Sequence, residues 1–366
     1  MRKIVLSLLL FLWFSVIYAQ DNTTSDHFLN KAYSCIVTSP DSALHYADSV
    51  LANNQALFEQ RINAFTIKGI VYKNKGFYDL ATNNYINALQ NAVQSNDKGR
   101  ISVCLNNIGV IFKAQKNYPL AVKYFKASIK IEEPLNNPLQ SSIRYYNLAE
   151  TYLEQDSTLL ANLYFTKSML IEEQESNLEG IIYGNYGLAL VELKRENLAT
   201  AKKQMLTSLA MIDSSSFVEI KFNITNALGE IYALENSLDS SNHYFQMIQN
   251  YDRKNDFLEM WIASCDGLAK NHYELMHYKK AYDYKNTHDS LNTNMLNVIA
   301  NQKIEELSYL YNFSIKEKEI AQLKHNKQSL TEKKEMANDL LIFILFSVFL
   351  VLIALIIRRV GKNTHE

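Results

Sequence analysis

The sequence predicts an all-α protein built as a linear array of helical hairpins, and three observations support this. Small residues recur in pairs 12 positions apart, and an aromatic residue usually follows four positions after the second of them. The pattern repeats every 40 residues, as from Gly69 to Gly109. Glycine and proline are scarce, with 10 and 4 among 366 residues, as long helices require. A linear array escapes the size limit of a compact domain.

The clearest unit is the stretch 106–128, NNIGVIFKAQKNYPLAVKYFKAS. Its first half has the apolar spacing of a helix, with Gly109 on the packed stripe. Pro119 follows a short polar break and is tolerated only in the first turn of a new helix. Ala121 and Phe125 then face back on the first helix, and the small residues at 109 and 121 allow the two helices to cross closely.

The pattern predicts about seven such units over 25–293. The small first-helix residues are Gly69, Gly109, Ala149, Gly187, Gly229 and Ala269, and the second helices are marked by Ala81, Ala121, Ala161, Ala201, Ser241 and Ala281. One copy is irregular, because Ala201 comes two residues late after Gly187. The first copy shows only its second helix, at Ala43, Ala47 and Val50.

This pattern resembles the tetratricopeptide repeat (TPR), whose common form has about 34 residues. The 12-residue spacing inside a unit is unchanged, so the extra residues are expected between one unit's second helix and the next unit's first helix. We interpret them as longer helices together with a looser connection. The resemblance implies that the first helices line a concave face.

The N-terminus 1–19 has the features of a secretory signal peptide. Arg2 and Lys3 precede the apolar run Ile4–Tyr18, and Ala19 is a small residue at a suitable cleavage site. The alternative is a retained membrane anchor. A signal peptide would place the repeats outside the cytoplasm, in the periplasm, where disulfides form.

The sequence contains three cysteines, and an odd number cannot all pair within the chain. We therefore interpret Cys35, Cys104 and Cys265 as buried small residues.

The C-terminal part changes character after residue 293. The stretch 294–338 has no glycine or proline, and Ile304, Leu307 and Tyr311 begin a thin heptad seam that Ile320, Leu323, Leu330 and Ala337 continue after a phase slip. Two interpretations stay open: a coiled coil that makes a homodimer, and a lone helix that caps the array.

The stretch 340–357 is apolar except for Ser347 and predicts one transmembrane helix of the inner membrane. Basic residues begin the tail 358–366, which we expect in the cytoplasm.

No motif predicts catalysis, a cofactor or a metal site. The sequence contains no HExxH, GxSxG, P-loop or CxxC, and the net charge of −1 provides no basic field for nucleic acid. The acidic pairs Glu132–Glu133 and Glu172–Glu173 end second helices, where we expect solvated faces. His272 and His277 do not share a helical face, which makes them poor metal ligands.

The expected binding surface is therefore the concave face. Its exposed positions lie three before, one after and four after each small first-helix residue. These groove positions are Thr66, Ile70, Lys73, Asn106, Val110, Lys113, Tyr146, Glu150, Leu153, Asn226, Glu230, Ala233, Asp266, Lys270 and Tyr273. They are rich in amides and mixed in charge, and Lys73 and Lys113 lack the basic cluster that a clamp for a terminal carboxylate would need. The alternative for each position is an ordinary solvated helix face.

From Tyr278 onward, the segment KKAYDYKNTHDSLNT and the later QKIEELSYLYNFSIKEKEIAQLKHNKQ resemble exported TPR sensors of Bacteroidetes. The resemblance implies a signal peptide, repeats of about forty residues, a long helix and one membrane span before a cytoplasmic output module. No output module follows the span in this sequence, so we expect neither kinase nor transcriptional activity. We predict an anchored, extracytoplasmic TPR protein that binds or scaffolds a protein or peptide. The alternative is the ligand-sensing half of a split or decayed signalling regulator. A glycan-binding outer-membrane protein is disfavoured by the predicted span.

Overall fold

The computed structural model describes residues 24–212, 217–251 and 258–308, together with the single positions 310, 322, 328, 329, 332 and 336. The chain divides into two compact units, Met1–Lys303 and Ile304–Glu366. Within the described residues all regular structure is helical, without a strand. The predicted signal peptide, transmembrane helix and tail lie outside these residues. None of the helices in the described ranges is long and apolar enough to cross a membrane.

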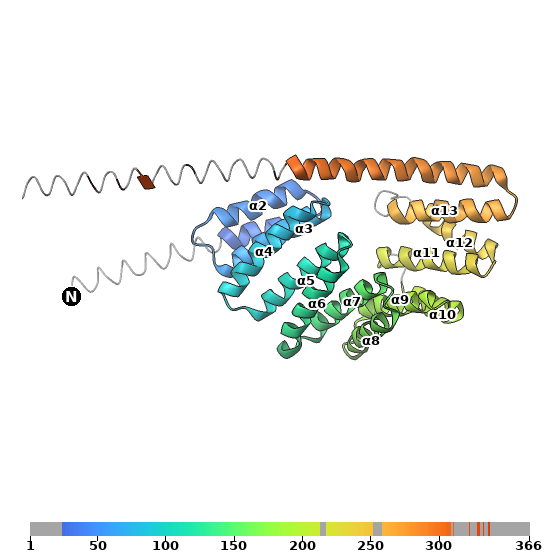
Figure 1. The fold of residues 1–366 in the computed structure, drawn as a ribbon, viewed down its shortest axis with the longest axis horizontal. Coiled ribbons are helices and arrows are strands. Elements are labelled where there is room, and N and C mark those ends of the chain that lie inside the picture. The colour runs from blue at the N-terminus through green and yellow to red at the C-terminus, as the bar shows by residue number, and fades with distance from the viewer. Residues whose placement is uncertain are drawn as a thin grey trace, which may run out of the picture. The chain divides into compact units, whose positions relative to one another are not determined.

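Successive antiparallel helices pair into hairpins, and the pairs follow one another along the first unit (Figure 1). The first pair consists of a helix at 24–35 and α2 (Pro40–Ala52). The next are α3 (Phe58–Asn74) with α4 (Tyr78–Gln94), α5 (Lys98–Ala114) with α6 (Tyr118–Glu132), α7 (Pro138–Glu154) with α8 (Thr158–Gln174), α9 (Leu178–Lys194) with α10 (Leu198–Ala210), α11 (Val218–Leu234) with α12 (Leu238–Gln249), and α13 (Leu258–Glu274) with a helix over 278–308. A short 3-10 turn (η1, Glu133–Leu135) extends α6, and the four prolines all stand at helix starts or in this turn.

The expectation of a looser connection between units is wrong where α4 leads to α5 and α8 leads to α9, but longer connections separate α10 from α11, at 211–217, and α12 from α13, at 250–257. Most of the helices have 17 residues, and the turn at 95–97 between units is as short as the turn at 75–77 inside one. Two such helices and two three-residue turns account for the whole 40-residue period. In units built this way the additional residues lengthen the helices alone, which increases the area that each pair buries against the next.

From the pair α3 and α4 onward, each turn inside a unit contains one residue in the left-handed backbone region. In the first of them, Gly76 has φ of 75° and donates its N–H to the Lys73 carbonyl at 2.9 Å, while Phe77 donates to the Tyr72 carbonyl at 2.8 Å. This is the Schellman arrangement that satisfies the last carbonyls of a helix. The equivalent residues recur every 40 positions as Lys116, Asp156, Glu196, Asn236 and Met276.

The irregular copy at Gly187 was assigned in the wrong register. A Cβ on Gly187 would overlap the Phe165 ring of the preceding unit, so this glycine is small for a contact with α8. The fully buried Ala189 lies 12 residues before Ala201 and packs in one cluster with it and Met205. Ala189 is therefore the small residue of this unit, and the period of 40 holds without interruption from Gly69 to Ala269.

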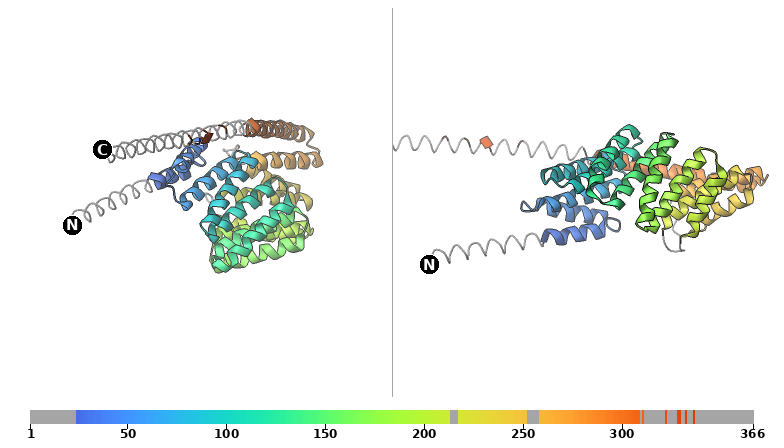
Figure 2. Two further views of the ribbon diagram at one scale, coloured as in Figure 1. Left: turned by 60° about the vertical axis from the view of Figure 1, so that its left-hand side comes forward. Right: turned by 90° about the horizontal axis from the view of Figure 1, so that it is seen from below.

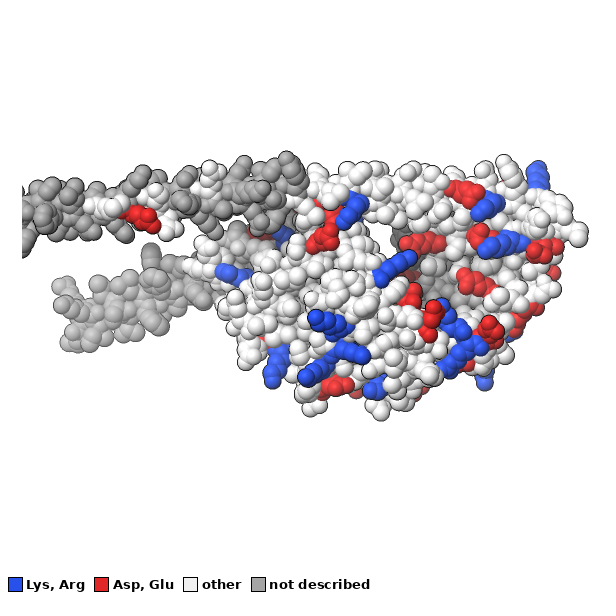
Figure 3. Space-filling model, viewed as in Figure 1, with Lys and Arg blue, Asp and Glu red and all other residues white. Residues whose placement is uncertain are grey.

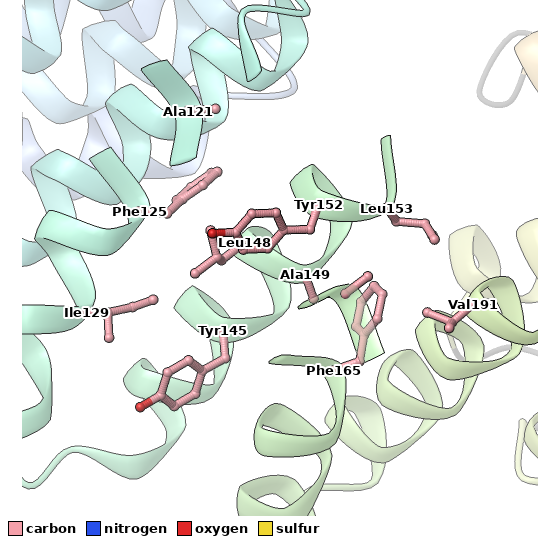
Figure 4. Close-up of a cluster of buried hydrophobic side chains, with 11 residues drawn as sticks. Ala121, Phe125, Ile129, Tyr145, Leu148, Ala149, Tyr152, Leu153, Phe165 and Val191 are labelled. Carbon is pink, nitrogen blue, oxygen red and sulfur yellow. The ribbon is translucent and has the colours of Figure 1, made fainter. Parts of the chain in front are cut away.

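The core is continuous because each unit packs its side chains against those of the next. In the best-formed cluster, Phe125 of α6, Leu148 and Ala149 of α7, and Phe165 of α8 interdigitate (Figure 4). Gly109 makes room for the Phe125 ring, which lies 2.7 Å from where its Cβ would be. The closest contact of Gly109 is therefore with Phe125, the aromatic residue four positions after Ala121, and not with Ala121 itself.

The first helices of successive units approach one another. α3 contacts α5, α5 contacts α7, α7 contacts α9, and α11 contacts both α9 and α13, while no comparable contact joins successive second helices among the described pairs. Figure 2 shows the pairs stacked side by side in this order. The first helices therefore lie on the inner side of the curved array.

The last helix runs without a break through residues 293 and 294, so the second helix of the final unit and the start of the predicted long helix are one element. Within the first compact unit, Lys303 Nζ lies 3.3 Å from Asp79 Oδ2, at the start of α4. The heptad positions Ile304 and Leu307 are exposed, and the remaining seam positions lie outside the described residues. Dimerisation through this helix stays a prediction.

The three cysteines are free, with Cys104 and Cys265 buried and Cys35 half-buried. Burial raises the pKa of the Cys104 thiol to about 12, and neighbouring Asp97 acts in the same direction against Arg100. The interpretation as small buried residues is confirmed for Cys104 and Cys265.

Candidate functional site

The predicted groove positions fall on five of the first helices. α3 contains Thr66, Ile70 and Lys73; α5 contains Asn106, Val110 and Lys113; α7 contains Tyr146, Glu150 and Leu153; α11 contains Asn226, Glu230 and Ala233; and α13 contains Asp266, Lys270 and Tyr273. Most of them are half-buried or exposed. Two are buried and offer little to a partner: Leu153 packs in the core, and Asn106 accepts a hydrogen bond from Asn147.

Charges in the groove form ion pairs, one between neighbouring units and one within a helix. Lys113 of α5 forms an ion pair with Glu150 of α7, and Lys270 Nζ lies 2.7 Å from Asp266 Oδ2 within α13. The space-filling view shows acidic and basic side chains interspersed around the hollow of this face (Figure 3). A groove with paired charges suits a partner of mixed polarity better than a strongly charged one.

The middle of the groove contains tyrosines next to carboxylates. Tyr146 packs edge-on against Tyr183 at 5.8 Å between ring centroids. Burial raises the pKa of Tyr146 well above its ordinary value, and Glu150, Tyr186 and Tyr183 add to this shift. Burial likewise raises the pKa of Tyr186, with added effects of Glu150 and Glu230. Because Tyr146 of α7 packs on Tyr183 of α9, and Tyr186 of α9 is influenced by Glu150 of α7 and Glu230 of α11, these three helices contribute to one continuous surface.

Glu230 is an exposed groove position of α11. Partial removal of water raises its pKa, opposed by the amide of Asn226, which donates to its Oε1 at 2.8 Å, and by the charge of Lys270. A carboxylate in such a place gains from a ligand that donates hydrogen bonds.

One set of groove residues was missed because of the register error. With Ala189 as the small residue of α9, the equivalent positions are Tyr186, Leu190 and Leu193. All three are half-buried. Adding 40 to Ala149 in the sequence would have found them.

Two cavities coincide with groove positions, one at the last unit and one in the middle of the array. One of about 530 Å³ is lined by Asp266, Lys270 and the exposed Tyr273, together with the exposed Tyr278 and Tyr282 of the last helix. A second of about 280 Å³ is lined by Lys113, Glu150 and Leu190, among others. The walls of both cavities are mostly apolar with a few polar groups, as is typical of ligand-binding sites.

The expectation that the acidic pairs are solvated is wrong for one member of each. Glu133 and Glu173 are exposed, but Glu132 and Glu172 are 2% and 4% exposed. Glu132 lies next to Arg144, with 3.1 Å from Oε2 to Nη2, and Arg144 is itself 1% exposed. Sequence reasoning had no signal for this pair, because its partners are 12 residues apart on different helices.

Glu172 lies beside a cavity of about 340 Å³ between α7, the end of α8 and the start of α9. Its lining residues are Ser142, Ile143, Tyr146, Ser168, Glu172, Asn177, Glu179, Gly180 and Tyr183. Tyr146 thus belongs both to this cavity and to the groove.

No cluster of metal-ligating side chains exists within the residues that the structure describes. The His272 and His277 rings lie 5.6 Å apart between centroids, but His272 stacks on Tyr284 and is buried.

Comparison with solved structures identifies the fold as a TPR-like helical repeat. The apo form of RapI aligns with a TM-score of 0.60 at 15% identity, over 75% of this chain and 99% of that chain. The apo form of the quorum sensor NprR from B. thuringiensis aligns with 0.55 at 12%, over 78% and 81%. A tetratricopeptide repeat protein from Parabacteroides merdae aligns with 0.53 at 11%, over 77% and 100%. No family model and no curated protein matches the sequence.

Proposed function

We propose that this protein binds a protein or peptide partner along the groove formed by its first helices. The observation that supports this most directly is that side-chain contacts join the first helices of successive units: Lys113 of α5 pairs with Glu150 of α7, and Tyr146 of α7 packs on Tyr183 of α9. A surface made by several units can follow an extended ligand, as helical repeat arrays do. The proposal assigns the chain no catalytic step.

The groove has the composition of a recognition surface. Tyrosines present large contact areas at a small cost in side-chain entropy, and they are enriched where proteins bind partners. Here they stand beside carboxylates that lack full solvation, and the cavities at Lys113 and Lys270 leave room for side chains of a ligand. Similarity in fold to a quorum sensor favours a sensing role as a second candidate, which rests on analogy of fold alone.

A photoreactive amino acid at Glu230 in the groove should capture the partner in cells, and one at Lys203 should not. Lys203 is exposed on the second helix α10 and serves as the matched control. We expect the capture to fall at least tenfold when Glu150 and Tyr186 are replaced by lysine and serine, with helicity by circular dichroism unchanged. Equal capture from Lys203, or full capture by the double variant, would place binding outside the groove.

We further propose that the repeats are exported and anchored by one membrane span, on the basis of the segments 1–19 and 340–357. A fusion of alkaline phosphatase after Asn294 should be active, because that enzyme folds only outside the cytoplasm. A fusion after Lys362 should be inactive, because Arg358 and Arg359 hold that end inside. The reverse pattern would refute the topology.

A further inference from the structure

Two successive units contain the same buried polar set, 40 residues apart. The first consists of Ser102, Ser128 and Glu132, and the second of Ser142, Ser168 and Glu172. All six side chains are less than 9% exposed. The serine hydroxyls of each set lie within hydrogen-bonding distance, 3.0 Å in the first and 2.9 Å in the second. The two sets therefore place the same three residue types at equivalent buried positions, with the two hydroxyls paired in each.

In the first set, a guanidinium group completes the site. Arg144 reaches back from α7 and donates from Nε to the Ser102 and Ser128 hydroxyls at 2.9 and 3.0 Å. Its Nη1 donates to the carbonyl and the side chain of Gln140 at 2.6 and 2.8 Å. Its Nη2 lies 3.1 Å from Glu132 Oε2, close enough for an ion pair although not aligned as a hydrogen bond.

In the second set, the positions that would supply this cation are glycines. Gly184 stands where Arg144 stands one unit earlier, and Gly180 corresponds to Gln140. The four positions that Arg144 contacts in the first set correspond to Ser142, Ser168, Glu172 and Gly180, and all four line the 340 Å³ cavity. A side chain at Gly180 would overlap the Glu172 carboxyl, so this glycine makes room for the carboxyl at the wall of the cavity.

The Glu172 carboxylate has only neutral partners. Ser142 donates to its Oε1, and Asn177 Nδ2 donates to its Oε2 at 2.7 Å. Among the ion pairs of the described ranges, none involves Glu172. A buried carboxylate without a cation gains strongly from one, because the cost of removing its water has already been met in folding.

The remaining walls suit a planar cation. Tyr146 and Tyr183 line the cavity and can offer ring faces to a guanidinium group. Burial raises the pKa values of both phenols, to about 12 for Tyr183, so both are neutral at physiological pH. The exposed Glu179 lies at the cavity as a second carboxylate. A volume near 340 Å³ exceeds the roughly 30 Å³ share of a water molecule about tenfold and leaves room for an alkyl stem.

We propose that this cavity binds a guanidinium group of a ligand, held by Glu172, Ser142 and Ser168 in the way that Arg144 is held one unit earlier. The group can come from an arginine side chain of a bound peptide or from a free small molecule such as arginine. The inference goes beyond groove binding and does not depend on it, because each can be lost while the other is kept.

The test is calorimetric titration of the full-length chain with L-arginine, using L-citrulline as the neutral isostere. Saturable heat is expected with arginine and none with citrulline at the same concentrations. The capped peptide Ala-Arg-Ala, with its citrulline counterpart, forms the second arm. Tighter binding of the peptide than of free arginine identifies a partner's side chain as the source, and the opposite order identifies a small molecule.

Variants locate the site. Glu172→Gln should weaken arginine binding at least tenfold, about 1.4 kcal/mol, whereas Glu173→Gln on the same turn of α8 should leave it unchanged. Gly184→Arg, whose side chain must displace that of Met169, should abolish binding by bringing a guanidinium to Glu172 as Arg144 does to Glu132. The proposal is overturned if neither arginine nor the peptide binds, if citrulline binds as well as arginine, or if Glu172→Gln binds like the wild type. The last outcome is decisive even where Gly184→Arg fails to fold.

Discussion

An alanine at position 144 should destabilise the repeat array by about 3–5 kcal/mol, the range for breaking one side of a buried ion pair. Arg144 and Glu132 are both almost completely buried. Removal of the guanidinium leaves the Glu132 carboxylate without a cation and the Ser102 and Ser128 hydroxyls without their shared donor. Each unsatisfied buried group costs the free energy of removing its water.

Urea and thermal unfolding followed by circular dichroism measure this effect. The control is Lys194→Ala, which breaks an ion pair with Asp156 that is at least half exposed on both sides and should cost less than about 1 kcal/mol. The double variant Arg144→Met with Glu132→Leu should recover much of the loss, because well-packed apolar residues can replace a buried pair. An Arg144→Ala midpoint as high as that of Lys194→Ala would show that the pair does not stabilise the fold.

Ala121→Arg should destabilise the protein by several kcal/mol. Ala121 is fully buried in the cluster with Phe125 and Leu148, so the new side chain adds volume where none is free. Overpacking alone costs about 1–3 kcal/mol, and the added charge has no carboxylate in that cluster. The damage should spread to the neighbouring units, because one continuous core joins them (Figure 4).

The matched control is Ala114→Arg, the same substitution at the exposed last residue of α5 in the same hairpin. It should be close to neutral, since a basic residue is favourable in the last turn of a helix. Differential scanning calorimetry of the two variants beside the wild type gives the comparison. If Ala121→Arg unfolds at the same temperature as Ala114→Arg, the assignment of Ala121 to the hairpin core is mistaken.

The all-helical repeat fold could be predicted from the sequence because its signal is local and recurs. The spacing of 12 between small residues reflects contacts inside one hairpin, and the period of 40 reflects the identical length of successive hairpins. Both depend on residues close in the chain, and each copy repeats the same signal. The one error of register arose at Gly187, where a glycine serves a contact with the unit before it.

The groove could be predicted only as a set of positions. Helical spacing placed Tyr146, Glu150, Glu230 and Lys270 on first helices, and the structure has them there. Their exposure was decided by neighbours from other units: Asn106 is covered and bonded to Asn147, and Lys113 is paired with Glu150. Such contacts join residues about 40 positions apart, beyond the reach of a local pattern.

The sequence by itself determined the architecture of the array, since the free energy of a helical hairpin depends on residues within a few turns of each other. Only the tertiary structure decided the state of the acidic residues. Glu132 and Glu172 occupy the same place in successive repeats, yet one is paired with Arg144 and the other lines a cavity, because Gly184 takes the position of Arg144 in the next unit. The difference is the residue that the next unit contributes at this position, which is Arg144 in one case and Gly184 in the other. Because the site is buried, this single difference decides whether the carboxylate is paired with a cation.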